Sequence, residues 1–225
     1  MSWSTGKDSA YALAQLLGNE TYDVAGLFTT VTRDYERVAM HGVRQELLQR
    51  QAELLGLPLF PVYITKDCTY ETYEEEMRRL IAQAQSHHVT AMVFGDLFLD
   101  DVRQYRVRML EGSGIEPLFP LWHYDTHDLA HSIIQSGIKA MVTCVDLAQL
   151  PQDFVGKPYD DAFLNALPAQ VDKCGENGEF HTFVYESPLF REPIPITLGE
   201  FVVREGFGFA DVLPEINSAQ CKLYT

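Results

Sequence analysis

The first 122 residues alternate between two hydrophobic periodicities, and this alternation restricts the fold more than any other feature of the sequence. Helical windows place apolar residues three and four positions apart, whereas the segments between them are short apolar runs typical of buried strands. We expect helices at Lys7–Leu17, Met40–Leu55, Tyr70–Gln85 and from about Asp100, and strands at Val24–Thr30, Pro58–Ile64, Ala91–Phe94 and Pro117–Leu121. Strands and helices in this order predict an α/β fold, with a parallel sheet covered by helices on both faces.

Short polar or glycine-containing segments follow the predicted strands. They are Ser4–Ser9, Thr29–Thr30 and Gly95–Asp96. Ligands of such folds bind beyond the carboxyl ends of the strands, so we expect these segments to lie close together. Only Met1–Trp3 precede the first of them, which predicts either a longer N-terminus or a stunted first strand.

The last hundred residues have a different character. Helices are expected at His127–Ser136 and Asp160–Leu167, and strands at Ala140–Val145, Phe180–Tyr185 and Phe201–Val203. Several prolines interrupt this part of the chain. We therefore expect a first domain over residues 1–122 and a smaller α+β lobe over residues 123–225.

The charge excludes several classes of partner. Lys and Arg number 17 against 32 Asp and Glu, a net charge of −15. Such a surface disfavours broad binding to nucleic acids or anionic membranes, although a local basic pocket for a small anion stays open. No apolar run approaches the roughly 20 residues of a membrane span. The cysteines Cys68, Cys144, Cys174 and Cys221 form no CxxC pair, which indicates reduced thiols and a cytoplasmic protein.

The segment Ser4–Ser9 has the composition of an anion-binding loop at a helix N-terminus. Backbone N–H groups and the helix dipole attract phosphate there, and Lys7 adds a positive charge. It is not a Walker A loop, because Met1 stands where the first glycine is needed and Asp8 where Ser or Thr is needed. A polar helix cap without a ligand is the alternative interpretation.

A second candidate is the segment Cys174–Val184, which combines two glycines and two carboxylates before a predicted strand. Gly175 and Gly178 permit turns with positive φ. Glu176 and Glu179 have the chemistry to accept a proton or hydrogen bond from an amine, to hold Mg²⁺, or to orient a nucleophile. Taken alone, the segment is better explained as a solvated turn.

Together the two segments resemble a known family. Ser4–Ser9 is similar to the S-G-G-x-D-S signature of the PP-loop, or adenine nucleotide alpha-hydrolase, superfamily, with Thr5 in place of the middle glycine. With that loop, the second segment resembles the diphthine–ammonia ligase family, whose members carry G-E-G-G-E-(Y/F)-E-T before a strand. Further similarities follow in the family's order at Gly95–Asp96, Tyr105–Arg106, Glu111, Gly114–Leu118, Leu121–Trp122 and Gly156–Lys157, and the resemblance extends to about Phe190.

Three positions depart from the family pattern. Asn177 and His181 stand where the eukaryotic and archaeal ligases have Gly and Glu, and no cysteine follows Glu111. The departures lie in the presumed acceptor-binding part. With His181, the segment is more similar to bacterial branches of the family in which diphthine itself is absent, some of which are associated with corrinoid metabolism. The resemblance therefore supports ATP use more firmly than it supports diphthine as the substrate.

The resemblance implies a Rossmann-like (HUP-type) ATP-binding domain, a substrate-binding lobe and amide-forming ligase chemistry. An acceptor carboxylate is adenylated with release of pyrophosphate, and ammonia then displaces AMP. No glutaminase domain fits into the remaining length, so ammonia comes from solution. The acceptor is a modified protein side chain or a small molecule, and a homo-oligomer is compatible with the sequence.

The implied site residues fall into four groups. ATP is assigned to Ser4, Thr5, Gly6, Lys7, Asp8, Ser9, Thr29, Thr30, Met40, Gly95 and Asp96, and Mg²⁺ to Asp8 and Asp96. The acceptor is assigned to Tyr105, Glu111, Lys157, Cys174, Gly175, Glu176, Asn177, Gly178, Glu179, His181 and Thr182. Catalysis is assigned to Lys7, Asp8, Glu176 and Glu179.

Other functions remain open at this point. A PP-loop enzyme that transfers sulfur needs reactive cysteines, for which Cys144 and Cys174 are the candidates. A tRNA-adenylating enzyme is opposed by the net negative charge. A module that binds ATP without turnover would not need the segment Cys174–Val184. His127 and His131 have the i, i+4 spacing of metal ligands, but no third ligand is evident and we interpret them as polar helix residues.

Overall fold

The first half of the chain forms a parallel sheet in the order β3, β1, residues 1–3, β4, β5, in a computed structural model that describes residues 1–215. β1 (Leu27–Thr32) pairs with β3 (Leu59–Ile64), and β4 (Ala91–Val93) pairs with β5 (Glu116–Leu118). Residues 1–3 join the two pairs, because Ser2 bridges Phe28 of β1 and donates its N–H to the carbonyl of Val93 at 2.8 Å. They form the stunted first strand that the sequence predicts.

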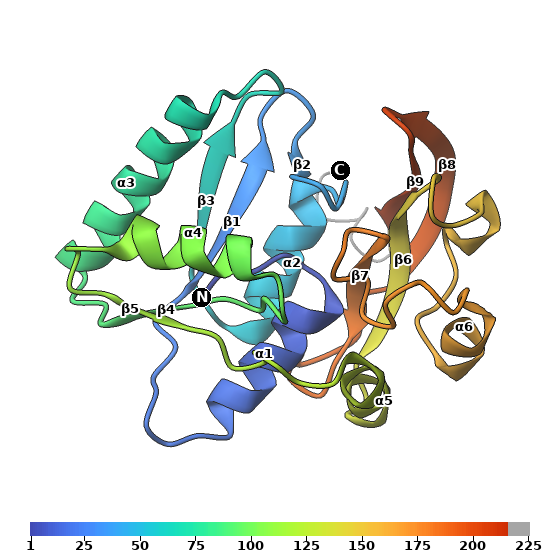
Figure 1. Cartoon of the computed structure of the whole chain (residues 1–225), viewed down its shortest axis with the longest axis horizontal. Helices are drawn as coiled ribbons and strands as arrows, with labels where there is room; N and C mark the ends of the chain where they lie inside the picture. Colours follow the sequence, from blue (N-terminus) through green and yellow to red (C-terminus); the bar gives the residue numbers. More distant parts are fainter. Residues whose placement is uncertain (216–225) are drawn as a thin grey trace, which may run out of the picture.

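Helices cover both faces of this sheet (Figure 1). They are α1 (Lys7–Leu17), α2 (Gln45–Leu55), α3 (Tyr70–Ser86) and α4 (Asp100–Leu110). Successive strand residues point to opposite faces. Phe28 of β1 therefore packs with Met77 of α3, while its neighbour Leu27 joins the core cluster that contains α1 and α2. The predicted α/β fold class is confirmed.

The helix expected from Met40 was wrong in its start, because α2 begins at Gln45. Residues 37–44 instead form a tight turn that includes the two-residue strand β2 (Arg37–Val38), which the sequence did not predict. Met40 and Gly42 have φ values of 64° and 69°, and such left-handed conformations cannot continue a right-handed helix.

The second half is built on an antiparallel sheet in the order β7, β6, β9, β8. The strands are β6 (Lys139–Asp146), β7 (Phe180–Glu186), β8 (Ile196–Arg204) and β9 (Phe207–Pro214), and they are accompanied by α5 (Thr126–Gln135), η1 (Gln152–Phe154) and α6 (Asp161–Ala166). β9 was not predicted, and the expected strand Phe201–Val203 is part of the longer β8. Glu205 and Gly206, both with positive φ, form the two-residue turn between them.

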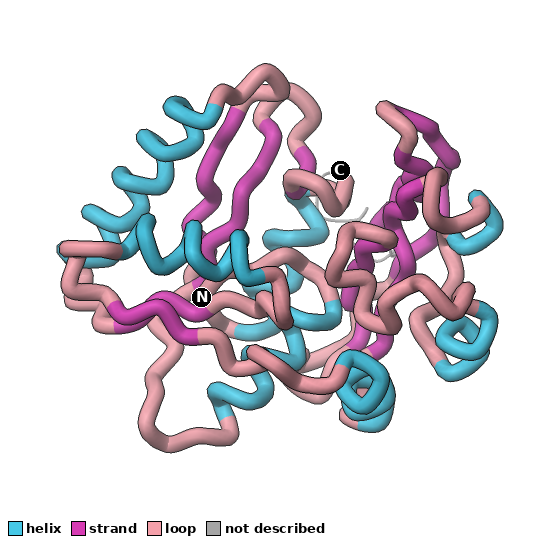
Figure 2. The backbone as a smooth tube through the Cα atoms, viewed as in Figure 1, coloured by secondary structure: helices cyan, strands magenta, loops and turns pink. Residues whose placement is uncertain are grey.

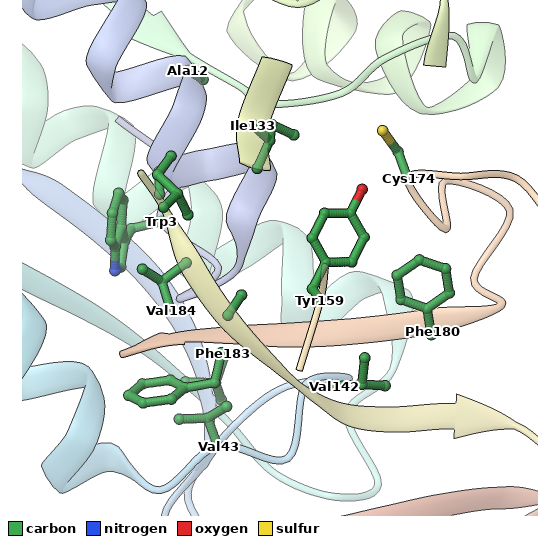
Figure 3. Close-up of a cluster of buried hydrophobic side chains, with 14 of the residues drawn as sticks. Trp3, Ala12, Val43, Ile133, Val142, Tyr159, Cys174, Phe180, Phe183 and Val184 are labelled. Carbon is green, nitrogen blue, oxygen red and sulfur yellow. The ribbon is translucent and has the colours of Figure 1, made fainter. Parts of the chain in front are cut away.

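The two halves share one hydrophobic core. α1 and α2 lie between the parallel sheet and β7, and one cluster contains Trp3 together with Phe183 and Val184 of β7 (Figures 1 and 3). Gln51 of α2 is fully buried in this core, where it accepts from Trp3 Nε1 at 2.8 Å and donates to the Val184 carbonyl at 2.7 Å. The division after residue 122 stays a prediction.

Gly95–Asp96 and residues 174–179 lie in loops and turns (Figure 2), whereas Thr29–Thr30 lies inside β1 and Lys7–Ser9 begin α1. Cys221 lies outside the described residues. Over residues 1–215, no helix combines the length and the apolar character needed to cross a bilayer.

Candidate active site

The loop Ser4–Ser9 connects the short first strand to α1 and holds its shape through hydrogen bonds within itself. The Ser4 hydroxyl donates to Ser9 Oγ at 3.1 Å, and Ser9 Oγ donates to the Gly6 carbonyl at 2.9 Å. Gly6 is the N-cap of α1 and provides no capping side chain. The first turn of α1 therefore directs backbone N–H groups and the positive end of the helix dipole toward the loop, which suits an anion such as phosphate.

Gly6 has a packing role that the sequence did not indicate. A Cβ atom at this position would lie 3.1 Å from the Thr182 carbonyl oxygen, 3.2 Å from Thr182 Oγ1 and 3.3 Å from His41 Cε1. The Lys7 N–H also donates to Thr182 Oγ1 at 3.1 Å. The glycine thus lets the loop approach β7 closely, whereas sequence reasoning assigned it to the approach of a phosphate.

Lys7 points away from solvent and connects the loop to the second segment. Its side chain is 2% exposed, and Nζ lies 2.8 Å from Asp8 Oδ2, donates to the Cys174 carbonyl and lies about 5 Å from the ring centroids of Tyr159 and Phe180. Burial alone lowers the pKa of Lys7, but the charge and the hydrogen bond of Asp8 oppose it, so the pKa is raised and the side chain stays an ammonium.

The second segment brings two carboxylates of different character to this place. Glu176 accepts from the Leu97 N–H at 2.8 Å, and its pKa is raised to about 7. Burial is the main cause; the neighbouring charges of Asp8 and Asp96 add to it, and the Leu97 hydrogen bond opposes it. A carboxyl group with such a pKa exchanges protons near neutral pH.

Glu179 is 1% exposed, and one of its oxygens is held firmly. Oε1 accepts from the Asp172 N–H and from Asn177 Nδ2, both at 3.0 Å. Gly175, with φ of 72°, makes the turn that precedes it, and a Cβ there would lie 2.8 Å from the Phe180 carbonyl oxygen. Asn177 at this position therefore orients Glu179 within the segment.

The segment Gly95–Asp96 lies against the start of α1 from the other side. A Cβ at Gly95 would lie 3.5 Å from backbone atoms of Asp8 and Ser9. Burial raises the pKa of Asp96, although Arg106, whose Nε lies 3.7 Å from Asp96 Oδ2, opposes the shift. The Ser4–Ser9 loop, the second segment and Asp96 therefore gather at the carboxyl end of the parallel sheet.

The carboxylates of this cluster suit a divalent cation. Asp8 and Asp96 both raise the pKa of Glu176, so the three groups share a negative field that a cation would relieve. Asp96 Oδ2 is buried and has no hydrogen-bond partner. Mg²⁺ is bound through one or two carboxylates plus substrate phosphates, so Asp8 and Asp96 fit such a role.

Buried side-chain atoms without a hydrogen-bond partner concentrate around the same cluster. Within residues 1–215 they are Thr5 Oγ1, Asp96 Oδ2, Tyr105 Oη, Arg106 Nε, Asp172 Oδ2, Glu179 Oε2 and His181 Nε2. Each belongs to one of the three segments above, or to the residues of α4 and the 172–174 turn that touch them. Native proteins rarely leave such atoms unsatisfied, and binding sites are where they do so.

Other residues predicted for the site lie differently. Thr29 is buried and donates to the Trp3 carbonyl at 2.6 Å, which ties β1 to the first strand, while Thr30 is half-buried and accepts from the Ala39 N–H. Met40 is 68% exposed. Glu111 and Lys157 are exposed, and in the described part of the chain neither forms a hydrogen bond or ion pair with the Ser4–Ser9 loop through its side chain. Their roles stay predictions.

His41 was missed by sequence reasoning. Its ring centroid lies 4.5 Å from that of His181, and its ring packs against Gly6 and Thr182. Burial lowers the pKa of His181 to about 4 and lowers that of His41 well below its ordinary value, so both rings are neutral at pH 7. Its place directly after Met40, which had been assigned to ATP, was the one available signal.

The cysteines and the histidine pair of α5 have simpler explanations. Burial raises the pKa of Cys144 to about 12 and raises that of Cys174 further, so neither forms a thiolate readily, which opposes sulfur transfer. Asp125, His127 and Asp128 gather because Asp125 caps α5 by accepting from the N–H groups of His127 and Asp128. His131 contacts Asp161 at 3.2 Å.

Comparisons with known proteins connect this geometry to a family. The diphthamide synthase N-terminal domain matches residues 1–117, and the diphthamide synthase C-terminal domain matches residues 125–215. The chain is 28% identical to the diphthine–ammonia ligases of Bos taurus and Homo sapiens, over 93% of its own length and 86% of theirs. It is 26% identical to the diphthine–ammonia ligase of Schizosaccharomyces pombe, over 88% of its own length and 36% of that protein.

Proposed function

The chain belongs to the diphthamide synthase family, and from that premise we propose that it is an ATP-dependent ligase that converts an acceptor carboxylate into an amide with ammonia. One observation carries the proposal. Lys7 joins the loop at the N-terminus of α1 to the segment that holds Glu176 and Glu179. A phosphate-binding helix terminus and a proton-accepting carboxyl group thereby lie at one place.

The first step forms an acyl-adenylate. An oxygen of the acceptor carboxylate attacks the α-phosphorus of ATP, the bond between the α-phosphorus and its bridging oxygen to the β-phosphate breaks, and pyrophosphate leaves. The N–H groups of α1 and the hydroxyls of Ser4 and Ser9 hold the phosphates, and the buried Lys7 ammonium adds positive potential nearby. Asp8 and Asp96 would hold Mg²⁺, which supplies charge neutralisation at the phosphates when bound.

The second step forms the amide. The ammonia nitrogen attacks the carbonyl carbon of the acyl-adenylate, the bond from that carbon to the AMP oxygen breaks, and AMP leaves with that bond's electron pair. The nitrogen must also lose a proton. We assign its acceptance to Glu176, because a carboxyl group with a pKa of about 7 is both available and basic enough near neutral pH.

The acceptor is the least determined part. The relatives are named for diphthine, and we take a diphthine-bearing peptide as the first acceptor to test. His181 differs from the family pattern at the border of the cluster, so a small-molecule acceptor is the alternative, to be sought in a metabolite extract.

The free cysteines Cys68, Cys144 and Cys174 agree with a cytoplasmic location.

Product analysis tests the proposal. The purified protein is incubated with ATP, Mg²⁺, ammonium and either the peptide or the extract, and the nucleotides are separated. We expect AMP and pyrophosphate in equal amounts, with formation increasing with ammonium. ADP as the product would contradict the proposed bond cleavage, and binding of ATP without turnover with any acceptor would favour a binding module.

A lysine pair provides the matched control. Lys7→Ala should abolish AMP formation, whereas Lys66→Ala, at an exposed position, should leave it unchanged. A thermal melt of each variant separates loss of the fold from loss of the reaction. Full activity in a folded Lys7→Ala protein would remove Lys7 from the mechanism.

A further inference from the structure

A row of aromatic rings follows the carboxyl ends of β4 and β5. The ring centroids of Phe94 and Phe119 lie 5.6 Å apart in a stacked arrangement, and those of Phe119 and Trp122 lie 5.8 Å apart, edge to face. Phe94 is buried. The row therefore forms a rigid platform below α4.

Two arginines of α4 lie over this platform. Arg103 has its guanidinium carbon 5.0 Å from the ring centroid of Trp122 and 5.3 Å from that of Phe119, and Arg106 has its own 5.1 Å from that of Phe94. Residues three apart lie on the same face of a helix, so the two cations are neighbours. Stacking fixes their planes without using their N–H donors.

The guanidinium N–H groups of this pair make few contacts with carboxylates, although the protein carries a net charge of −15. Within residues 1–215, Arg103 forms no ion pair. Arg106 lies 3.7 Å from Asp96, too far for a hydrogen bond, and donates from Nη1 to Tyr73 Oη at 3.5 Å, while its Nε is buried without a partner. Two oriented guanidinium groups with free donors form a ready site for a carboxylate.

Two chains of contacts connect this pair to the proposed active site. Arg106 reaches it through Asp96, which influences the ionisation of Glu176. From the other end of the platform, the residue after Trp122 donates its N–H to the carbonyl of Leu97 at 2.9 Å, and the N–H of Leu97 is the donor to Glu176. The pair therefore borders the cluster on the side away from the second sheet.

We propose that Arg103 and Arg106 form the subsite that binds a carboxylate of the acceptor, so that the enzyme takes acceptors carrying a carboxylate group at this place. The choice of ligand rests on the proposed function. The N-terminus of α1 is already assigned to the phosphates of ATP, which leaves the acceptor carboxylate for the arginine pair. Arg103 is exposed and forms the entrance, whereas Arg106 lies deeper, with 21% of its side chain exposed.

A binding experiment tests the subsite without any turnover. Glutarate, a small dicarboxylate, is titrated into the full chain while tryptophan emission is recorded. Trp122 lies in the subsite, and Trp3 is buried in the core. We expect a saturable change with glutarate and none with glutaramide, its uncharged diamide. Absence of a saturable change in the wild-type protein would overturn the proposal, whatever the outcome of the amidation assay.

Variants locate the response. Arg103→Gln and Arg106→Gln should each raise the dissociation constant for glutarate about tenfold (~1.4 kcal/mol), and Trp122→Phe should remove the signal. Arg79→Gln, an exposed arginine of α3 paired with Glu75 and Glu76, is the matched control and should change nothing. An unchanged constant in both arginine variants would place glutarate elsewhere and overturn the assignment.

The KM values for the acceptor and for ATP show which of the two ligands the arginine pair binds. In an active assay, Arg103→Gln should raise the KM for the diphthine peptide about tenfold and leave the KM for ATP unchanged. Arg103→Lys retains the charge but not the planar donors, so it should recover part of the loss. A raised KM for ATP instead would assign the pair to the nucleotide and contradict the proposal.

Discussion

The loop Ser4–Ser9 and the segment 172–182 meet in one site, but different kinds of contact hold them. In the first, the Ser4 and Ser9 hydroxyls bond within the loop, while the Thr5 carbonyl accepts from the Val184 N–H. In the second, Glu179 Oε1 is held by its neighbours Asp172 and Asn177, while Glu176 depends on Leu97, 79 positions away. Lys7 joins the two regions through Thr182 and the Cys174 carbonyl.

This difference suits the two regions to different roles in the site. The side chains of Ser4, Lys7, Asp8 and Ser9 in the loop all have hydrogen-bond partners and only Thr5 Oγ1 lacks one, as expected for a phosphate-binding loop that must keep its shape. The second segment places ionisable groups with unmet hydrogen-bonding capacity, such as Glu179 Oε2 and His181 Nε2, where reacting atoms would lie. The loop should therefore respond to mutation through stability and nucleotide binding, and the segment through turnover.

Glu176→Gln should give the largest effect, and on turnover alone. Removing the proton acceptor should lower amide formation about 100-fold, with the KM for ATP unchanged. In the wild type, activity should rise as the pH passes through about 7, because the group must be ionised to accept a proton, and the variant should lose this step. A pH profile of kcat for both proteins measures it.

The stability of the same variant checks the interpretation. In the folded protein the pKa of Glu176 is raised to about 7, so ionisation of this group opposes folding as the pH rises from the unfolded pKa of about 4.3 through about 7. Glu176→Gln should therefore raise the melting temperature at pH 8 and not at pH 4. A lower melting temperature at pH 8 would mean that Glu176 supports the fold rather than the reaction.

Gly6→Ala should break the contact between the two regions. The new methyl group would lie 3.1 Å from the Thr182 carbonyl oxygen and force the loop away from β7, with a loss of ~1–3 kcal/mol in unfolding free energy and weaker ATP binding. Urea unfolding and nucleotide titration measure the two effects.

Gly18→Ala is its matched control. Gly18 ends α1 with an ordinary helical φ of −75°, and a Cβ there would meet only helix carbonyl oxygens at 3.5 Å or more. We expect no loss of stability from it. Equal losses in both variants would remove the special role of the Gly6 contact.

Asp211→Asn should give a smaller effect outside both regions. Asp211 of β9 binds Arg44 at 2.7 Å and Arg37 at 3.0 Å, and so ties the second sheet to the turn before α2. These side chains are partly exposed, so we expect a loss of about 1 kcal/mol. The variant Glu192→Gln, at a more exposed ion pair with Arg50, should lose less.

The pH dependence of this tie has a definite sign. The Arg44 hydrogen bond lowers the pKa of Asp211 below its unfolded value. Its contribution is therefore complete above the unfolded pKa of about 3.9 and lost as the pH falls through the lower folded value. The difference in melting temperature between Asp211→Asn and wild type should be present at pH 7 and shrink toward pH 3.

The elements that the sequence predicts correctly are those set by local contacts, and the ones it misses are set by distant contacts. Helix α1 was predicted with its observed bounds, since its apolar spacing and the glycine that ends it are local signals. The start of α2 was wrong because Met40 adopts a positive φ that no pattern announces. β9 was missed because its pairing with β8 and β6 comes from tertiary contacts.

The site shows the same limit. The Ser4–Ser9 loop was predicted from its residues alone to lie at a helix N-terminus, which the structure confirms, and its role in binding an anion stays a prediction. The approach of Cys174 to Lys7 spans 167 positions and has no signature in spacing or composition, so only the family resemblance suggested that the two segments belong together. The His41–His181 contact had no such support and was missed.

Transfer of isotopic oxygen tests the central claim most directly. The acceptor peptide is prepared with ¹⁸O in both oxygens of its carboxylate and incubated with the protein, ATP, Mg²⁺ and ammonium. The masses of AMP and of the amide product are then measured by mass spectrometry. If the carboxylate attacks the α-phosphorus and ammonia displaces AMP, each AMP carries one ¹⁸O and the amide retains the other. Unlabelled AMP, or label found in inorganic phosphate with ADP, would contradict the account.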